Sequence, residues 1–480
     1  MKVFSVFSKF PKTFWIVNVM ELFERWAYYG MFVVLSVYLT NPVSEGGLGF
    51  TNSQRGIMQA IVTAIIYLLP VLGGAIADRF GFRKVLLTAF VCMTSGYYFM
   101  GQFNSYALVF AAFLILAVGA SIFKPIISAT ISKSTTKDND TIGFGIFYMI
   151  VNIGGFIGPF VASRLRDLNW NYVFMMSAFI ILINFVLLYF YKEPGRQETK
   201  SNDALGKSIL QIFRNMGLAL SDKRFLLFII IMVGFWTTYW QIYFTLPVYI
   251  TQWVNTSDIY NSSSFIASAI GTEVDGIGLI RPEQIINIAA FTIIFFQVII
   301  SSLVMKVRPV ASIIFGGIVI AFGMGQFAFH ISGLYFVMGI MIIAFGEMSS
   351  SPRVQEYIGR IAPRDKVALY MGVSYLPMAG GNLIGGLLSG FLYDQMSDKY
   401  VYLKEELLIR GYASMESMQN MDGGILFKDA MAYLNMSEHQ LNKMLYSNYH
   451  PGNIWFVFAA IGAGTALLLF LYDRLLLSKK

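Results

Sequence analysis

Apolar residues dominate the chain in long runs that short polar stretches separate. A helix needs about 20 mostly apolar residues to cross the hydrocarbon core of a bilayer. Twelve runs of about this length lie at 14–39, 55–77, 85–102, 105–131, 142–164, 170–191, 225–254, 284–305, 310–330, 333–359, 367–393 and 453–475. The pattern predicts an all-α polytopic membrane protein with twelve transmembrane helices, and an even number of spans leaves both ends of the chain on one side.

Two longer polar stretches interrupt the runs. Residues 193–224 predict a linker between an N-terminal six-helix bundle, 1–192, and a C-terminal one, 225–480. Within the linker, KSILQIFRNMGLAL has the spacing of an interfacial amphipathic helix. The second stretch, 394–452, carries amphipathic segments in LKEELLIRGY and MSEHQLNKMLYSNY. We expect a helical loop outside the membrane there, serving either as a structural cap or as a surface for a partner.

Composition and charge agree with a membrane protein. Hydrophobic residues make up 56% of the chain and charged residues 13%, against roughly 25% charged in an ordinary soluble domain. The net charge of +8 could indicate nucleic acid, but the basic residues concentrate in alternate loops, as with Arg83, Lys84 and Lys306. Basic loops favour the cytoplasmic side. We therefore expect a multi-pass protein of the cell inner (plasma) membrane with both termini cytoplasmic and no nucleic-acid partner.

Cysteine and histidine are scarce. The single cysteine, Cys92, excludes an internal disulfide and a multi-thiolate metal site. The three histidines, His330, His439 and His450, lie at the end of a span or in the predicted outer loop. No nucleophile with a matched base is evident, so we expect no enzyme activity, no metal and no cofactor.

A GxxxG pattern recurs six spans apart. Gly154 and Gly158 lie in the fifth run, and Gly381 and Gly385 lie in the eleventh. Such glycines let two helices approach closely, which alone indicates ordinary helix packing. Their recurrence at equivalent positions favours a duplicated six-plus-six transporter architecture.

Ionisable residues inside apolar runs are the most informative feature, since each costs about 2.5 to 3.5 kcal/mol at the bilayer centre. Glu21, Glu24 and Arg25 have helical i, i+3, i+4 spacing and share one helix face. Lys124 lies in the fourth run and Glu347 in the tenth. These residues line an aqueous cavity or form buried ion pairs. Acids beside bases are also candidates for proton carriers.

Hydrogen-bonding and aromatic residues accompany these charges and suit a small polar solute. They are Tyr28, Tyr29, Tyr67, Asn152, Trp240, Asn287 and Ser351. Packing or interfacial positions are the alternative for the tyrosines, because the chain contains 27 of them.

Several motifs resemble one family. ELFERWAYYG, starting at Glu21, resembles the ExxERFxYYG signature of proton-coupled oligopeptide transporters, a branch of the major facilitator superfamily. GGAIADRFGFRK, starting at Gly73, resembles the superfamily's motif between the second and third helices. FKPIISATIS, FYMIVNIGGFIGP and GEMSSSP are similar to family stretches in the fourth, fifth and tenth helices.

The resemblance implies a role for each matched residue. Glu21, Glu24, Arg25 and Glu347 would serve proton coupling. Arg25 and Lys124 would bind the carboxylate of a peptide, and Glu347 and Asn287 would bind the amino end of the peptide. Tyr28, Tyr29, Tyr67 and Asn152 would contact the peptide backbone, with Trp240 and Ser351 also in the site. Asp78 and Arg79 would brace the cytoplasmic gate. A guanidinium suits a carboxylate because its donors form a two-pronged pair.

The chain departs from the family pattern at three positions. Phe32 stands where many relatives have a basic residue, and Trp240 stands where an acid commonly precedes Gln241. Losing both charges predicts an aromatic or apolar closure in place of a salt bridge. Ile126 replaces the asparagine of the KPN motif, which removes a polar contact.

The interpretation is a secondary transporter that takes up di- and tripeptides with protons by alternating access. The proton is its coupling ion, and we expect a monomer. An alternative keeps the superfamily but moves another small zwitterionic or amphipathic solute, such as a modified amino acid or a drug-like compound. A receptor that binds without transport is a further alternative.

Overall fold

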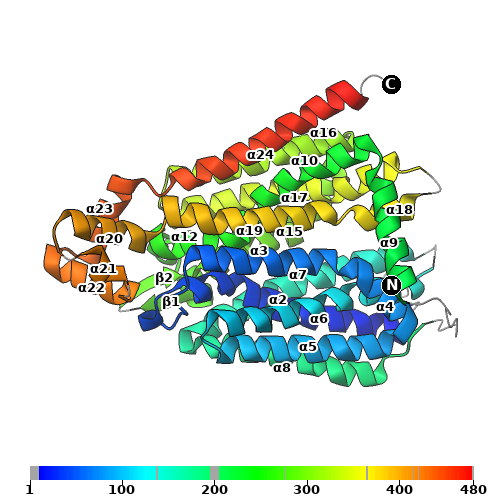
Figure 1. The fold of residues 1–480 in the computed structure, drawn as a ribbon, viewed down its shortest axis with the longest axis horizontal. Helices are drawn as coiled ribbons and strands as arrows, with labels where there is room; N and C mark the ends of the chain where they lie inside the picture. The colour runs from blue at the N-terminus through cyan, green and yellow to red at the C-terminus, as the bar shows by residue number, and fades with distance from the viewer. Residues whose placement is uncertain are drawn as a thin grey trace. The chain divides into compact units, whose positions relative to one another are not determined.

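The structure is a computed structural model that describes residues 10–136, 139–194, 205–274, 276–363, 366–412, 414–419 and 421–477. Helices dominate it (Figure 1). Both extreme ends of the chain, the middle of the predicted linker, and residues 413 and 420 of the predicted outer loop lie outside this range.

Every predicted span is helical. The unbroken ones are α2 (Lys12–Thr40), α5 (Phe82–Gln102), α6 (Tyr106–Lys133), α7 (Asp140–Leu168), α8 (Trp170–Phe190), α15 (Pro282–Val304), α16 (Pro309–Gly325), α17 (Gly333–Ile361) and α24 (Asn453–Tyr472). The others are divided into α3 (Asn52–Leu68) and α4 (Pro70–Phe80), into α10 (Lys223–Tyr239), α11 (Gln241–Phe244) and α12 (Leu246–Trp253), and into α18 (Val367–Val373) and α19 (Leu376–Met396).

Eight helices of the described chain are long and apolar enough to cross a membrane, and the pair α3 and α4 makes a ninth if its two parts are one span. The chain is therefore an all-α polytopic membrane protein. The three remaining predicted spans, α2, α5 and α19, have 29, 21 and 21 residues, and α2 carries three charges in its middle. Their crossing, and with it the count of twelve, stays a prediction.

The second predicted span is bent by 48° between α3 and α4. Pro70 is the first residue of α4. A proline lacks the backbone N–H and its ring crowds the preceding turn, so the helix cannot continue straight. Pro125 in α6, Pro159 in α7 and Pro352 in α17 lie inside helices that continue past them.

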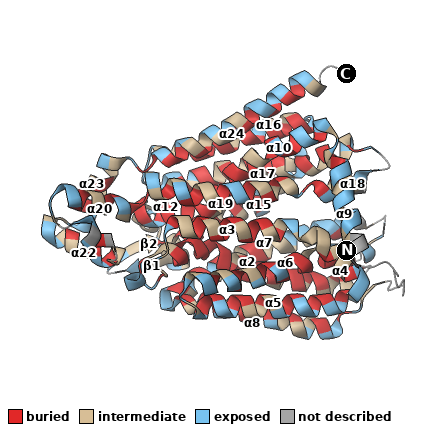
Figure 2. Cartoon of the chain, viewed as in Figure 1, coloured by how far each residue is buried: buried red, intermediate tan, exposed pale blue. Residues whose placement is uncertain are grey.

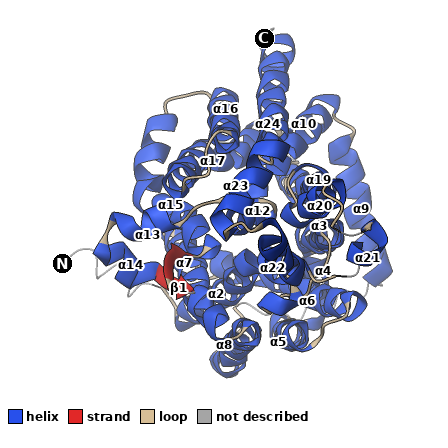
Figure 3. Ribbon diagram, turned by 90° about the vertical axis from the view of Figure 1, so that its left-hand side faces the viewer, coloured by secondary structure: helices blue, strands red, loops and turns tan. Residues whose placement is uncertain are grey.

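Shorter elements connect the spans. They are η1 (Val43–Glu45), α9 (Leu205–Leu220), α13 (Ser257–Ser262), α14 (Ser264–Ile270), β1 (Gly271–Val274), β2 (Ile277–Ile280), η2 (Gln326–Ala328), α20 (Lys399–Ile409), α21 (Met415–Gln419), α22 (Gly423–Leu434), α23 (Glu438–Tyr449) and η3 (Asp473–Leu477). The antiparallel pair β1 and β2, with Gly271 opposite Ile280, is absent from the prediction (Figure 3). Strands of four residues are too short for an alternating pattern to reveal them.

Helices occur in both segments predicted to be amphipathic. The described part of the predicted linker contains α9, and the loop before the last span contains α20 to α23. We refer to residues 394–452 as the cap. Asp398, Asp422 and Ser437 cap the N-termini of α20, α22 and α23 with their side chains. Each accepts hydrogen bonds from backbone N–H groups that would otherwise lack a partner.

Packing contacts divide the chain into two compact units. The first unit comprises Met1–Met31, Val62–Ile230 and Gln355–Ala379, and the second comprises Phe32–Ile61, Ile231–Val354 and Gly380–Lys480. These bounds fall inside helices and do not follow the predicted bundles, 1–192 and 225–480. The division into two six-helix bundles stays a prediction.

In the first unit, α5 packs against α6 and α8. Each helix has a buried and an exposed side (Figure 2). The exposed residues of α8 include Phe179, Val186 and Phe190, which are 60 to 65% exposed. Exposed apolar side chains of this size suit contact with lipid.

The GxxxG glycines mark close helix contacts within each unit. A Cβ at Gly158 of α7 would lie 2.5 Å from the carbonyl oxygen of Trp26 in α2. In the second unit, a Cβ at Gly381 of α19 would lie 3.0 Å from the backbone nitrogen of Thr237 in α10. The fifth predicted span thus contacts the first, and the eleventh contacts the seventh, which is the recurrence that a duplication requires.

We predict that Gly158→Ala destabilises the protein while Gly145→Ala on the same helix does not. The added methyl at Gly158 would meet backbone atoms of α2, whereas none lies within 4 Å at Gly145. Overpacking of this kind costs about 1 to 3 kcal/mol, and alanine at an exposed helix position gains up to about 1 kcal/mol over glycine. Melting temperatures in detergent test this. Equal shifts for both variants would contradict the close contact of α7 with α2.

Candidate functional site

The predicted site residues fall in both units. The first unit holds Glu21, Glu24, Arg25, Tyr28, Tyr29, Tyr67, Asp78, Arg79, Lys124 and Asn152. The second holds Phe32, Trp240, Asn287, Glu347 and Ser351. The predicted chamber shared by the first, fourth and tenth spans therefore stays a prediction.

The charged triplet of α2 forms a buried ion cluster. Glu21, Glu24 and Arg25 are each no more than 6% exposed. Arg25 Nε donates to Glu24 Oε2 at 2.5 Å and lies 3.2 Å from Glu21 Oε1. The guanidinium also contacts Glu24 through Nη2. One cation thus neutralises part of the charge of two carboxylates, as the i, i+3, i+4 spacing predicts.

The helix α7 seals one side of this cluster. A Cβ at Gly154 would lie 2.8 Å from Arg25 Cβ and 2.6 Å from the carbonyl oxygen of Leu22. Because Gly154 has no side chain, the backbone of α7 can lie directly against α2 at the level of the charges. Close packing excludes water there and strengthens the electrostatic interactions of the cluster.

Lys124 of α6 supplies a second cation. Its ammonium lies 4.8 Å from the centre of the Tyr67 ring, and it interacts electrostatically with Glu21 and Glu24. Lys124 is partly buried and precedes Pro125 within α6. The first unit therefore brings together two acids and two cations from the first and fourth predicted spans.

Aromatic rings border the cations. The Arg25 guanidinium carbon lies 5.4 Å from the Tyr28 ring centre and 5.8 Å from the Tyr29 ring centre. The faces of these rings attract cations. Tyr28, Tyr29 and Tyr67 are thus placed beside the charges.

Asn152, Asp78 and Arg79 also belong to the first unit. The Asn152 amide donates to the carbonyl oxygen of Tyr148 in its own helix at 2.8 Å. Asp78 and Arg79 are exposed near the end of α4, and the Arg79 guanidinium lies 5.9 Å from the Phe80 ring centre.

In the second unit, Glu347 and Ser351 lie together on α17. The Ser351 hydroxyl donates to the Glu347 carboxylate one turn away. Gly346 is adjacent, and a Cβ there would lie 2.7 Å from the carbonyl oxygen of Gly316 in α16. Asn287 is buried in α15.

Phe32 and Trp240 contact each other. Their ring centres are 6.1 Å apart in an edge-to-face arrangement. Phe32 also lies 6.0 Å from the Tyr243 ring and 6.2 Å from the Phe244 ring. An aromatic contact therefore stands where the family pattern has two charges. Its role in gating stays a prediction.

The sequence analysis missed a buried arginine in the second unit. Arg55 of α3 is fully buried. It donates to the Ser389 hydroxyl at 3.0 Å, to the Ser389 carbonyl at 3.0 Å and to the Phe244 carbonyl. No described carboxylate forms an ion pair with it. The sequence feature that could have indicated it is the position of this charged residue at the start of a predicted span, 55–77.

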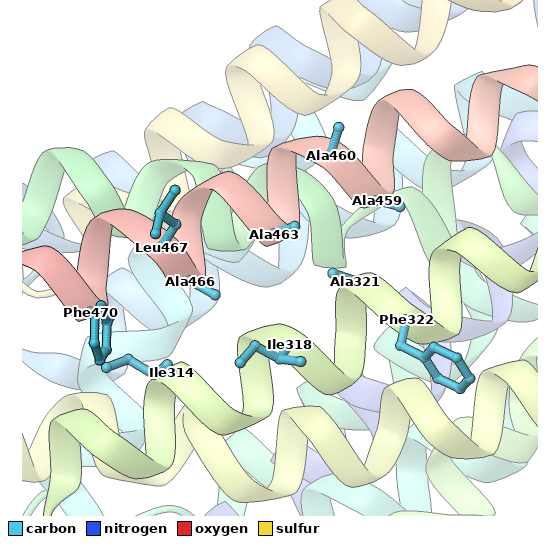
Figure 4. A pocket seen from close by; sticks show the side chains of 10 residues that line it. All are labelled: Ile314, Ile318, Ala321, Phe322, Ala459, Ala460, Ala463, Ala466, Leu467 and Phe470. Atoms are coloured by element: carbon cyan, nitrogen blue, oxygen red, sulfur yellow. The ribbon is translucent and has the colours of Figure 1, made fainter.

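An open groove elsewhere in the second unit is wholly apolar (Figure 4). It has a volume of about 680 Å³ and lies between α16 and α24. The lining residues are Ile314, Ile318, Ala321, Phe322, Ala459, Ala460, Ala463, Ala466, Leu467 and Phe470. None of the predicted site residues lines it, and its chemistry suits hydrocarbon better than a charged solute.

The chain is similar to known proteins in sequence and in fold. The profile of the Major Facilitator Superfamily matches residues 14–271. A di-/tripeptide transporter of Lactococcus lactis subsp. cremoris is 28% identical over 232 residues, which cover 46% of this chain and 44% of that protein. Dipeptide and tripeptide permease A of Citrobacter koseri is 24% identical over 433 residues, covering 80% of this chain and 85% of that protein.

A crystal structure of a POT family transporter in complex with 5-aminolevulinic acid has the same fold. It matches with a TM-score of 0.70 at 17% identity and covers 97% of this chain and 96% of that chain. The sequence alignments cover a smaller share of some relatives. Two of them span only 35% and 44% of the relatives' own length.

We predict that Arg25→Gln destabilises the protein by about 3 to 5 kcal/mol, because it leaves two buried carboxylates with reduced compensation. The double variant Glu24→Gln, Arg25→Gln should be destabilised less than Arg25→Gln alone. Unfolding of the purified protein in mixed micelles, followed by circular dichroism, measures both. Additive losses from the two substitutions would contradict the direct coupling of Arg25 with Glu24.

Proposed function

The chain belongs to the major facilitator superfamily, and we propose that it is a secondary transporter that couples proton entry to the uptake of di- and tripeptides. The buried cluster of two carboxylates, a guanidinium and an ammonium carries the proposal. Such groups are expensive within a membrane span and mark ion or substrate pathways. The relatives whose names specify dipeptides and tripeptides support the substrate class.

Proton and substrate compete for Arg25 in this proposal. While Glu21 and Glu24 are ionised, they hold the guanidinium. Protonating one of them weakens its ion pair and leaves Arg25 able to take a substrate carboxylate through a two-pronged hydrogen bond. After release of substrate, loss of the proton restores the internal ion pair. Coupling arises because proton and substrate both favour the same state of the carrier.

Glu24 suits the role of proton acceptor. Its Oε2 interacts with Arg25, while its buried Oε1 has no hydrogen-bond partner among the described residues. A protonated Glu24 could keep Oε1 as the hydroxyl and still face Arg25 with Oε2. Glu21 shares the same cation and provides the second candidate.

Lys124 provides the second anchor for a peptide carboxylate. Its ammonium lies over Tyr67, which leaves an electrostatic contact with the acids but no ion pair within 4 Å among the described residues. A substrate carboxylate that forms a direct ion pair with this ammonium would interact with it more strongly than the Tyr67 ring does. Tyr28, Tyr29, Tyr67 and Asn152 supply hydroxyl and amide groups for the peptide backbone.

Glu347 offers the opposite charge for a peptide ammonium. The hydrogen bond from Ser351 orients its carboxylate, and Asn287 offers an amide in the same role. Glu347 also joins Glu21 and Glu24 as a candidate for proton coupling. The roles of the cations and of Glu347 can be tested one at a time with peptides that lack one terminal charge.

The gates of this proposal differ in chemistry. Asp78 and Arg79 brace the cytoplasmic side. On the other side, the contact of Phe32 with Trp240 replaces a salt bridge, so closure there depends on apolar contact and is insensitive to salt. Trp240 also forms a wall for substrate side chains.

A second candidate function is transport of another small zwitterionic or amphipathic solute. The aromatic contact of Phe32 with Trp240 favours it, because an apolar gate suits a bulkier or less polar substrate. Competition of labelled dipeptide uptake by single amino acids, modified amino acids and tripeptides separates the two. A receptor without transport would bind in the same assay but show no flux into liposomes.

The proposed setting is the cell inner membrane, with a monomer whose termini are cytoplasmic. Basic residues at the loop between α4 and α5 support this orientation, since Arg79, Arg83 and Lys84 are exposed there. The cap then lies outside the cytoplasm.

We predict that Lys124→Ala lowers uptake of Ala-Ala by at least about tenfold, while uptake of the same dipeptide with a C-terminal amide changes little. The substitution removes one charged partner of the substrate carboxylate, worth about 1.5 to 3 kcal/mol. Lys133→Ala is the matched control, because Lys133 lies on the same helix with its ammonium 4.5 Å from the Phe82 ring. Undiminished Ala-Ala uptake by Lys124→Ala would refute the carboxylate role.

We also predict that Glu24→Gln abolishes accumulation of dipeptide driven by an inward proton gradient in proteoliposomes while counterflow exchange of dipeptide persists. The amide mimics a permanently protonated acid, so substrate can still bind but a proton cannot be released. Glu356→Gln serves as the control, since Glu356 pairs with Arg360 at 2.5 Å on α17. If the gradient still drives accumulation as in the parent, Glu24 is not the proton site.

A further inference from the structure

Three aspartates of the cap hold the connection between α2 and α3. Asp394 lies in the last turn of α19, where the cap begins, and Asp398 and Asp422 follow within the cap. Their partners are Ser44, Asn52 and Ser53, which lie more than 340 residues earlier in the chain. All six residues lie within the second unit.

Asp394 binds the N-terminus of α3. Its Oδ1 accepts a hydrogen bond from the backbone N–H of Asn52 at 3.2 Å, and its Oδ2 accepts from the backbone N–H of Ser53 at 2.9 Å. The Ser53 hydroxyl donates to Oδ2 at 2.5 Å. The first N–H groups of a helix have no partner within the helix and carry positive partial charge, so a carboxylate there is stabilising.

Asp398 binds the same turn through a side chain. The Asn52 amide donates to Asp398 Oδ2 at 2.5 Å, while Oδ1 caps α20. Burial raises the pKa of Asp398 to about 6. The carboxyl is therefore mostly ionised at neutral pH, and its hydrogen bond with Asn52 is charge-assisted.

Asp422 binds the connection at its other end. Ser44 donates to it twice, from the hydroxyl to Oδ1 at 2.5 Å and from the backbone N–H to Oδ2 at 3.2 Å. Partial burial disfavours the charge, but the bonds from Ser44, Ile425 and Gly424 outweigh it and lower the pKa of Asp422. A Cβ at Gly424 would lie 2.5 Å from Ser44 Oγ, so the contact is close.

The helices behind these carboxylates, α3 and α19, approach each other closely at glycines. A Cβ at Gly56 of α3 would lie 2.5 Å from the carbonyl oxygen of Gly386 and 2.7 Å from Cα of Gly390, both in α19. Arg55 of α3 also donates to the hydroxyl and the carbonyl oxygen of Ser389 in α19, at 3.0 Å each. The aspartates add further directional bonds at the end of this contact.

The cap itself is fixed to the C-terminal half of the chain. Trp253 of α12 donates from Nε1 to the carbonyl oxygen of Ser397 at 2.7 Å. Gln252 Oε1 accepts from the Tyr393 hydroxyl at 3.0 Å and from the backbone N–H of Lys399 at 3.1 Å. The carboxylates that accept these bonds thus belong to a segment anchored to α12 and α19, whereas their donors, Ser44, Asn52 and Ser53, lie between the first two predicted spans.

We propose that Asp394, Asp398 and Asp422 form a latch that holds the α2–α3 connection to α19 and the cap, and that this latch must release in each transport cycle. The proposal rests on the proposed function, because a carrier that alternates access separates its first spans from its later ones on the side being opened. Hydroxyl, amide and backbone donors suit such a latch, since water can replace each of them when the contact opens.

Spin labels at Val43 and Lys428 test the latch without reference to any substrate. Both residues are exposed, on η1 and α22. In a Cys92→Ser background, Val43→Cys and Lys428→Cys labelled with nitroxides should give a main short distance and a minor longer one by pulsed electron resonance. Asp422→Asn should raise the longer population several-fold. Asparagine still caps α22 with its Oδ1, but its amide cannot accept the Ser44 N–H.

The control for this measurement is Asp429→Asn, which makes the same chemical change on α22 and should leave the distances unchanged. Asp394→Asn should act in the same direction as Asp422→Asn. A distance distribution that neither Asp394→Asn nor Asp422→Asn alters would overturn the latch.

Cross-linking tests whether release is needed for transport. In the same background, Ser44→Cys with Asp422→Cys, joined by a short bifunctional thiosulfonate, should lose at least about 90% of dipeptide uptake and regain it with reductant. Arg410→Cys with Met444→Cys is the control, because Arg410 Nη2 lies 3.3 Å from Met444 Sδ within the cap. Full uptake after complete cross-linking at Ser44 and Asp422 would overturn the need for release. Absence of dipeptide uptake in the unlinked parent would instead refute the proposed substrate, and the spin-label result would still decide the latch.

Discussion

A charge inside a membrane span requires a compensating partner, and the arrangement around α2 follows from this requirement. Arg25 lies between Glu21 and Glu24, and Lys124 adds a second positive charge from α6. Two acids and two bases leave the cluster close to neutral while keeping its members individually reactive. A proton or a carboxylate that enters changes this balance, so the same electrostatics that makes the cluster tolerable in the membrane also makes it responsive.

Arg55 meets the requirement in a different way. It is buried without an ion pair to any described carboxylate, and it uses the carbonyl oxygens of Phe244 and Ser389 and the Ser389 hydroxyl as acceptors. Neutral acceptors hold the guanidinium without competing for a proton. Arg25 and Arg55 therefore illustrate two solutions to one problem, of which only the first can respond directly to protonation.

Sequence patterns revealed those features that depend on local spacing or on composition. The positions of the spans follow from hydropathy, the Arg25 cluster from helical spacing, and the amphipathic helices of the cap from periodicity. Two linked departures from a family pattern predict an aromatic or apolar closure at Phe32 and Trp240, and the structure places the two rings in contact. Asp394 and Asp422 could not be matched with Ser53 and Ser44, because serine and aspartate in loops are common and no periodicity relates residues so far apart.

Proton movement coupled to peptide movement is the central claim, and simultaneous recording of both tests it most directly. Purified protein in liposomes with an internal pH dye would be supplied with labelled Ala-Ala at equal internal and external pH. The liposomes would carry a membrane potential that is negative inside, which drives the entry of protons. The account predicts that the interior acidifies as dipeptide enters. It also predicts that both signals stop when the potential is made positive inside. Dipeptide entry with no change of internal pH would contradict it.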